Sequence, residues 1–195
     1  MTKQVLAISG KRFSGKDTLA DMLVGFAKAR GVAIVVHRFA DESKRMLVAR
    51  EVLRGVEVDF MRLKTDRAYK EHWRPRLTEL TVTELARDKL VFCKAVADRI
   101  ADNDVAFHIV ADLRLRLEVE HLRERFKVHV VRVSRNDAER EAAGWRFAEE
   151  IDRHHTETEL DDPALHSEVV ENNASLDALA AAAETMSRRL FPSPP

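Results

Sequence analysis

Residues 5–18 have the sequence VLAISGKRFSGKDT, an apolar run followed by a loop that begins at Gly10 and ends at Lys16. A continuous apolar run of this length predicts a strand that is buried on both faces. From Asp17 onward the apolar residues recur at helical spacing, and we expect that helix to stop at Gly31. The loop matches G-x-x-x-x-G-K and lies between a strand and a helix, which is the context that a phosphate-binding loop requires.

Beyond this stretch, apolar runs and helical patterns alternate along the chain. Strands are predicted at 32–39, 105–112, 128–133 and, more weakly, 168–171, and helices at 41–55, 117–126, 174–190 and over most of 65–102, with a break near Pro75. The alternation is typical of a parallel sheet. We therefore expect an α/β fold in a single domain, residues 1–195, with a five-stranded, mostly parallel sheet and helices on both faces.

The segment from Asn136 to Asp162 is charged and Arg-rich and has few apolar residues. Two interpretations fit it equally well. It is a mobile lid, residues 135–162, that closes over a site, or it is an ordinary solvated helix. The last residues, 191–195, are expected to form a frayed tail.

The overall composition excludes several classes of protein. Lys and Arg total 33, and so do Asp and Glu, so the net charge is zero, whereas a non-specific nucleic-acid binder is usually basic. The one cysteine, Cys93, excludes an intramolecular disulfide and a Cys-based zinc site. No apolar run approaches the roughly 20 residues that span a bilayer, and the N-terminal run is too short for a signal peptide. We expect a cytoplasmic protein with no nucleic-acid or membrane partner.

The loop residues suit phosphate binding for plain chemical reasons. Gly10 and Gly15 let the backbone wrap an anion, with N–H groups pointing inward. The start of the following helix adds partial positive charge, and Lys16 can reach the terminal phosphates. The residue after the lysine is usually Ser or Thr, but here it is Asp17, followed by Thr18. Asp17 either holds Mg²⁺ or favours the helix start, and the two roles are compatible.

Asp112 ends the predicted strand 105–112, and Arg114 follows two residues later. In open α/β sheets, ligands gather at the carboxyl ends of the strands. Asp112 is therefore expected near the glycine loop, where it holds Mg²⁺ through water or orients a substrate. The alternative for Asp112 is a helix cap or a turn residue.

These residues resemble the animal-type phosphomevalonate kinases, which are P-loop kinases of the nucleoside-monophosphate-kinase type. The resemblance runs in order along nearly the whole chain, and its most specific parts are the glycine loop with Asp17 and the block Tyr69-Lys70-Glu71. The shorter matching blocks are Arg74, Phe92-Cys93-Lys94, Asp112 with Arg114, Val131-Arg132-Val133, Arg140, Gly144-Trp145, Thr156-Glu157, Leu160-Asp161 and Val170-Glu171-Asn172.

The sequence departs from this family pattern at two positions, because Phe13 and Ala143 stand where the family has Lys and Arg. Both family residues are cations that serve phosphate groups, so the departures bear on the acceptor more than on the ATP site. Phage-type deoxynucleoside monophosphate kinases are also similar. That second similarity rests on Ser14-Gly15-Lys16-Asp17-Thr18 and on Asp112-Leu113-Arg114 with Glu118.

Both resemblances imply a P-loop kinase that uses ATP and Mg²⁺ and transfers the γ-phosphoryl group to a small phosphorylated substrate. The first implies (R)-5-phosphomevalonate, giving 5-diphosphomevalonate and ADP, and the second implies a deoxynucleoside monophosphate. Such an acceptor is already anionic at neutral pH, so positioning and charge neutralisation supply the catalysis without a strong general base. The oligomeric state stays open, a monomer included.

The resemblance and the charge pattern together assign candidate residues to each role. The catalytic candidates are Lys11, Arg12, Lys16 and Asp17. The ATP-binding candidates are Gly10, Lys11, Arg12, Phe13, Ser14, Gly15, Lys16, Asp17, Thr18, Arg140 and Asn172. The substrate-binding candidates are Lys70, Arg74, Asp112, Arg114 and Arg132, and the metal-binding candidates are Asp17 and Asp112. For any single one of these arginines, a solvated surface charge is an equally good interpretation.

Two alternatives belong to another class of protein. The first is a nucleotide-binding switch that hydrolyses slowly and acts through a partner; the sequence has no guanine-reading Asn-Lys-x-Asp block, which argues against a GTPase. The second is a degenerate kinase kept as a binding module, and Phe13 and Ala143 motivate it. Formation of a phosphorylated acceptor separates a kinase from both.

Overall fold

The structure is a computed structural model that describes residues 2–192, and the chain divides into two compact units. Residues up to His37 and from Ile100 onward form an α/β unit, and residues Arg38–Arg99 form a helical unit. This division is expected for a single domain with a helical insertion and also for two separate domains. The single domain over residues 1–195 therefore stays a prediction.

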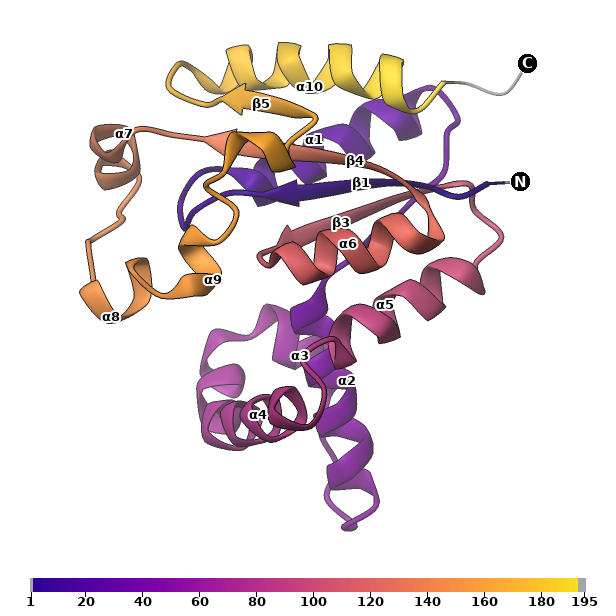
Figure 1. The fold of residues 1–195 in the computed structure, drawn as a ribbon. Coiled ribbons are helices and arrows are strands. Elements are labelled where there is room, and N and C mark those ends of the chain that lie inside the picture. Colours follow the sequence, from indigo (N-terminus) through magenta and orange to yellow (C-terminus); the bar gives the residue numbers. More distant parts are fainter. Residues whose placement is uncertain (1, 193–195) are drawn as a thin grey trace. The chain divides into compact units, whose positions relative to one another are not determined.

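Five parallel strands form the sheet of the α/β unit within the described residues, in the order β2-β3-β1-β4-β5 (Figure 1). They are β1 (Gln4–Ser9), β2 (Ile34–His37), β3 (Phe107–Leu113), β4 (Lys127–Ser134) and β5 (Glu168–Glu171). The central strand β1 pairs with β3 on one side and with β4 on the other. The predicted α/β sheet is confirmed, and the loop after β1 leaves from the middle of its carboxyl edge, where such sheets bind ligands.

Helices cover both faces of this sheet (Figure 1). α1 (Lys16–Ala29) and α10 (Leu176–Leu190) pack against each other on one face, and α6 (Arg116–Arg125) lies on the other. The apolar core joins the central strands to α1 and α10. Its largest contributions come from Leu6, Ile8, Leu19, Leu23, Ile109, Val131, Val133, Leu179 and Met186. Strand β1 is buried on both faces, which explains its unbroken apolar run.

The helical unit consists of α2 (Phe39–Val52), α3 (Phe60–Thr65), α4 (Arg67–Arg87) and most of α5 (Val91–Ala101). Helix α4 continues through Pro75, so the predicted break at that residue is wrong. Trp73 and Leu80, on either side of Pro75, are buried, and this packing outweighs the lost N–H donor. The break lies instead at Asp88, whose carboxylate accepts the N–H of Leu90 (2.9 Å). None of the helices in the described residues is long and apolar enough to cross a membrane.

The charged segment between β4 and β5 is not a single solvated helix. It contains α7 (Asp137–Ala142), α8 (Glu149–Asp152) and α9 (His155–Thr158), and the short 3-10 helix η1 (Pro163–Leu165) follows. Trp145 and Leu160 are only 4% and 2% exposed, so the segment has apolar anchors that its overall charge conceals. The interpretation as one ordinary solvated helix is therefore wrong, and the mobility of residues 135–162 stays a prediction.

The chain remains packed as far as Phe191, which is 1% exposed. Its ring meets the edge of Phe107 with ring centres 5.5 Å apart, and its carbonyl oxygen accepts a hydrogen bond from the Arg30 guanidinium (3.0 Å). The predicted tail, 191–195, is therefore wrong at its first residue, because an aromatic side chain that close to the last helix can still reach the core. Residues 193–195 lie outside the described part of the chain.

Candidate active site

The loop between β1 and α1 has a shape that depends on glycine at two positions. Gly15 has a φ of 93°, and a Cβ placed on it would lie 2.4 Å from Asn172 Nδ2. A Cβ on Gly10 would lie 2.4 Å from Ser14 Oγ and 2.9 Å from the carbonyl oxygen of Val133. The Asn172 amide donates a hydrogen bond to the Ser14 carbonyl oxygen (2.9 Å), so the residue after β5 braces the loop. A braced loop of this kind can present backbone N–H groups to an anion.

Phe13 projects from the same loop. It is the one non-glycine residue with a positive φ (61°) in the described chain, a strained conformation for a bulky residue. Its ring is 47% exposed and lies 3.9 Å from the place that a Cβ on Gly144 would take. The neighbouring Ala143 is exposed at the end of α7. The two departures from the family pattern therefore lie close together, on the loop and on the segment beside it.

Lys16 is half-buried at the start of α1, and this burial lowers the pKa of its ammonium group. The carboxylates of Asp17, Glu157 and Asp112 oppose this shift, whereas the charge of Arg114 adds to it. The structure therefore brings four predicted residues, Lys16, Asp17, Asp112 and Arg114, into one electrostatic neighbourhood.

Asp17 and Asp112 are the candidate metal ligands. The described residues contain no group of three or more His, Cys, Asp or Glu side chains that would hold a metal. Magnesium is commonly bound through one or two carboxylates, with water and substrate phosphates as its other ligands. Ser14 Oγ, in the adjoining loop, is buried and has no hydrogen-bond partner among the described residues. These donors fit Mg²⁺ held together with a phosphate rather than by the protein alone.

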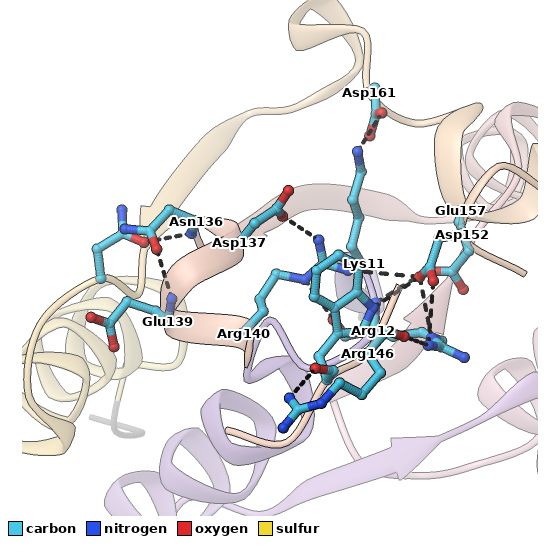
Figure 2. Close-up of polar contacts among 12 residues, drawn as sticks. Lys11, Arg12, Asn136, Asp137, Glu139, Arg140, Arg146, Asp152, Glu157 and Asp161 are labelled. Carbon is cyan, nitrogen blue, oxygen red and sulfur yellow. Dashed lines mark hydrogen bonds and ion pairs between the residues drawn. The ribbon is translucent and has the colours of Figure 1, made fainter. Parts of the chain in front are cut away.

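Two carboxylates from the segment 135–162 hold Arg12. Glu157 Oε2 accepts the backbone N–H of Arg12 (3.1 Å), and Asp152 Oδ1 lies 3.3 Å from the Arg12 Nε atom (Figure 2). Glu157 also pairs with Arg114, at the end of β3. The Glu157 side chain is only 4% exposed, so one buried carboxylate joins the glycine loop to β3.

A cavity of about 320 Å³ lies beside the loop and the carboxyl end of β4. Its charged lining includes Lys11, Arg132, Arg135, Arg140 and Asp161. Asp161 pairs with Lys11 (3.0 Å) and with Arg132. Burial lowers the pKa of Arg132, and the charge of Asp161 opposes that shift. The cavity has the size of a small-ligand site and suits an anion.

Arg140, an ATP-binding candidate, is buried and links α7 to the loop. Its Nε atom donates to the carbonyl oxygen of Arg12 (3.0 Å), and its guanidinium pairs with Asp137 (2.7 Å), as Figure 2 shows. The guanidinium also lies 3.9 Å from the centre of the Trp145 ring, whose indole N–H donates to Asp152 (3.1 Å). Arg140 therefore contacts the loop backbone, and its charge is already shared with protein groups.

Glu118 in α6 fixes the backbone that carries Arg114. Its Oε2 atom accepts the N–H groups of Arg114 (2.8 Å) and Leu115 (2.9 Å). Burial raises the pKa of Glu118 to about 7; the charge of Asp112 adds to this effect, and the two N–H donors oppose it. The turn after β3 is thus held by a side chain from the helix that follows it.

Lys70 and Arg74 lie on α4 of the helical unit. Burial lowers the pKa of Lys70, and the charges of Lys44 and Arg74 lower it further. Arg74 is 56% exposed and pairs with Glu71. Lys44 is buried, pairs with Asp41 (2.7 Å) and lines a cavity of about 240 Å³ together with Lys70. The helical unit therefore has a cation-lined cavity of its own.

Several of these residues were not among the predicted site residues, namely Lys44, Asp152, Glu157 and Asp161. No local pattern marks Glu157, because its partner Arg12 is 145 residues away in the sequence. The available signal was the family resemblance, since Glu157 and Asp161 both fall in matching blocks.

The strand order, with a glycine loop after the central strand and a half-buried lysine at the start of α1, is that of the P-loop kinases. Solved structures share this fold at 16% sequence identity. The Thermus thermophilus protein TT1252 has a TM-score of 0.56 and matches over 98% of this chain and 100% of that chain. A gluconokinase from Sinorhizobium meliloti 1021 has a TM-score of 0.53, over 97% and 94%.

Sequence comparison is more specific than the fold. A family model of phosphomevalonate kinase matches residues 8–128. The phosphomevalonate kinase of Drosophila melanogaster is 28% identical over 179 residues, which cover 89% of this chain and 90% of that protein. The chain belongs to the phosphomevalonate kinase family and is a phosphotransferase. The resemblance drawn from the sequence is confirmed.

Proposed function

We propose that this kinase transfers the γ-phosphoryl group of ATP to (R)-5-phosphomevalonate, giving 5-diphosphomevalonate and ADP. The observation that carries the proposal is the braced glycine loop ending in half-buried Lys16, in a chain of the phosphomevalonate kinase family. The name of the Drosophila melanogaster relative supports the same acceptor.

The loop residues 10–18 bind the triphosphate in this proposal. Lys11, Arg12 and Lys16 neutralise its charge, and a charge-assisted hydrogen bond in a desolvated site is stronger than one in water. Asp17 and Asp112 would hold Mg²⁺, which would add to the neutralisation of the phosphate charge.

Arg140 and Asn172 serve the ATP site by holding the loop. Asn172 does so through the Ser14 carbonyl oxygen and Arg140 through the Arg12 carbonyl oxygen. Both contacts engage carbonyl oxygens, so neither of them occupies an N–H group of the loop. We further propose that residues 135–162 form a lid that excludes water from the transfer.

In the transfer, an oxygen of the acceptor phosphate forms a bond to the γ-phosphorus while the bond from that phosphorus to the bridging oxygen breaks. The bonding electrons leave with ADP, and no proton has to be removed from the ionised acceptor. The proposed acceptor-binding residues of the α/β unit are Asp112, Arg114 and Arg132. Lys70 and Arg74 are the candidates in the helical unit. Positioning and charge neutralisation therefore supply the catalysis.

A deoxynucleoside monophosphate is the second candidate acceptor. Phe13 favours it, because the family cation is replaced here by an aromatic ring that is 47% exposed on the loop. An exposed ring can stack on a base, whereas it offers no charge to the phosphate of phosphomevalonate.

A coupled ADP-release assay tests the proposal. The wild-type protein with Mg²⁺ and ATP is screened with phosphomevalonate and with the deoxynucleoside monophosphates, and Lys16→Met serves as the inactive control. We expect ADP release that depends on phosphomevalonate and is lost in Lys16→Met. Turnover with a deoxynucleotide alone would replace the first candidate by the second, and no acceptor-dependent release would contradict both.

A further inference from the structure

The cations proposed to bind phosphate already have anionic partners in this structure. Asp161 pairs with Lys11 (3.0 Å) and Arg132, and Glu157 pairs with Arg114. Figure 2 shows the Lys11 side chain extended toward Asp161, with Glu157 beside Arg12. Both carboxylates come from the segment 135–162, so one part of the chain supplies the partners.

Glu157 also takes a donor of the glycine loop itself. Its Oε2 atom accepts the backbone N–H of Arg12 (3.1 Å), and its charge acts on Lys16 and Arg132. A loop N–H group, a guanidinium and a nearby ammonium are the donors that a phosphate oxygen uses. The Glu157 carboxylate therefore occupies two of these donors, the Arg12 N–H and the Arg114 guanidinium, and its charge acts on the Lys16 ammonium.

A phosphate and these carboxylates cannot share the donors at no cost. Two anions that close to each other repel strongly where the surroundings are desolvated, and the Glu157 side chain is only 4% exposed. An N–H donor aimed at a carboxylate oxygen must also be released before it can bind a phosphate oxygen. Phosphate binding therefore requires that Glu157 withdraw, and Asp161 to a lesser degree, because Asp161 is 40% exposed.

We propose that Glu157 and Asp161 act as internal competitors of phosphate, occupying the donors of the glycine loop and of β3 and β4 until a polyphosphate displaces them. This inference rests on the proposed triphosphate site. It adds a regulatory role to the segment 135–162: that segment lowers the apparent affinity for polyphosphate by the free energy of its own contacts. A change that weakens those contacts should tighten polyphosphate binding.

The test is calorimetric titration of the full chain with inorganic tripolyphosphate, which needs neither the acceptor nor turnover. Glu157→Gln keeps the shape and an oxygen acceptor but removes the charge. We expect it to bind tripolyphosphate about tenfold more tightly than wild type. For the more exposed Asp161→Asn we expect a gain of roughly two- to threefold. Glu149→Gln is the matched control, because Glu149 lies in α8, is 68% exposed and pairs only on the surface with Arg153.

The outcomes of the titration distinguish the inference from the proposed function. If Glu157→Gln binds tripolyphosphate no more tightly than the wild-type protein does, the inference is overturned and the proposed function still stands. If Glu157→Gln does not fold, Asp161→Asn decides alone, and equal or weaker binding by that variant overturns the inference. An equal gain in Glu149→Gln would also overturn it, because the effect would then be one of net charge. No tripolyphosphate binding by any of the proteins would overturn the proposed triphosphate site itself.

Discussion

The glycine loop and the segment 135–162 meet at the same cations, but different forces hold them. The loop is shaped by its backbone: Gly15 has a φ of 93°, and Asn172 fits against it only because no Cβ is present. The segment has apolar anchors of its own in Trp145 and Leu160, but Glu157 and Asp161 join it to the loop and the strand ends through charged contacts. A bound anion can replace a carboxylate in an ion pair, but it cannot replace a backbone conformation. In our proposal, the glycine loop is therefore the fixed part of the site, and the segment 135–162 is a lid that a competing anion releases.

The energies of the two kinds of contact differ in the same sense. A non-glycine residue in the left-handed conformation costs about 1–2 kcal/mol, whatever is bound. An exposed ion pair contributes only about 0–1 kcal/mol, and a buried one matters mainly when one partner is removed. Between Glu157 and Asp161, the buried Glu157 should therefore oppose phosphate binding more than the half-exposed Asp161.

The largest expected effect is the loss of the charge at the end of the loop. Lys16→Met should lower kcat by roughly 10²–10³-fold, because a charged donor aimed at the transferring group acts in a desolvated site. The variant should still fold, because burial disfavours the charged form of this lysine, as its lowered pKa indicates, and Met carries no charge. Steady-state kinetics measures the loss, with Lys28→Met, an exposed lysine on the same helix, as the control. Near-normal turnover in Lys16→Met would mean that the loop does not hold the triphosphate.

The next effect concerns Glu118, which holds the turn after β3. Burial raises the pKa of Glu118 from 4.5 to about 7 in the folded protein. The resulting stability is fully present below pH 4.5 and is lost as the pH rises through about 7, on the order of 3 kcal/mol. Glu118→Gln keeps the acceptor for both N–H groups and should flatten this slope. Denaturant unfolding between those pH values measures it, and a slope equal to that of the exposed control Glu120→Gln would refute the assignment.

A smaller effect tests the backbone side of the comparison. Gly15→Ala places a Cβ 2.4 Å from Asn172 Nδ2 at a positive φ, and it should cost about 1–2 kcal/mol of stability and weaken ATP binding. Gly25→Ala is the matched control, because Gly25 lies in the same helix with nothing within 4 Å of its Cβ position. That control should be more stable than wild type by about 0.5–1 kcal/mol. Equal melting temperatures for the two variants would show that the loop is not fixed by its glycines.

The smallest effect tests how the segment is attached. Trp145→Phe removes the indole N–H bond to Asp152 but keeps a ring beneath Arg140. We expect a loss of about 1 kcal/mol, seen as roughly fivefold faster hydrogen exchange over residues 145–158. Trp73→Phe is the control, because the Trp73 indole N–H is buried without a hydrogen-bond partner among the described residues. Faster exchange throughout the α/β unit would show that the segment is part of the core rather than a separable lid.

The parts of the molecule that were predictable are those determined by neighbouring residues. The strand before Gly10, the loop and the helix after Lys16 follow from an apolar run, a glycine spacing and a helical period. The electrostatic grouping of Lys16, Asp17 and Asp112 follows from the rule that parallel strands end at one edge.

The remaining features depend on contacts between distant residues. Glu157 accepts from Arg12 across 145 residues, and no periodicity encodes that pairing. The predicted helix break at Pro75 was wrong because burial of the flanking side chains outweighs the local cost of proline in the helix. The prediction of a frayed tail failed at Phe191 because an aromatic ring near the chain terminus can still pack in the core.

The most direct test of the central claim follows the phosphoryl group itself. The wild-type protein is incubated with Mg²⁺, phosphomevalonate and ATP that carries an isotopic label in its γ-phosphoryl group, and the products are separated. We predict that the label moves to the terminal phosphate of 5-diphosphomevalonate in equal amount to the ADP formed, and that Lys16→Met transfers it roughly 10²–10³-fold more slowly. Label that appears only in inorganic phosphate, or that stays in ATP, would contradict the account.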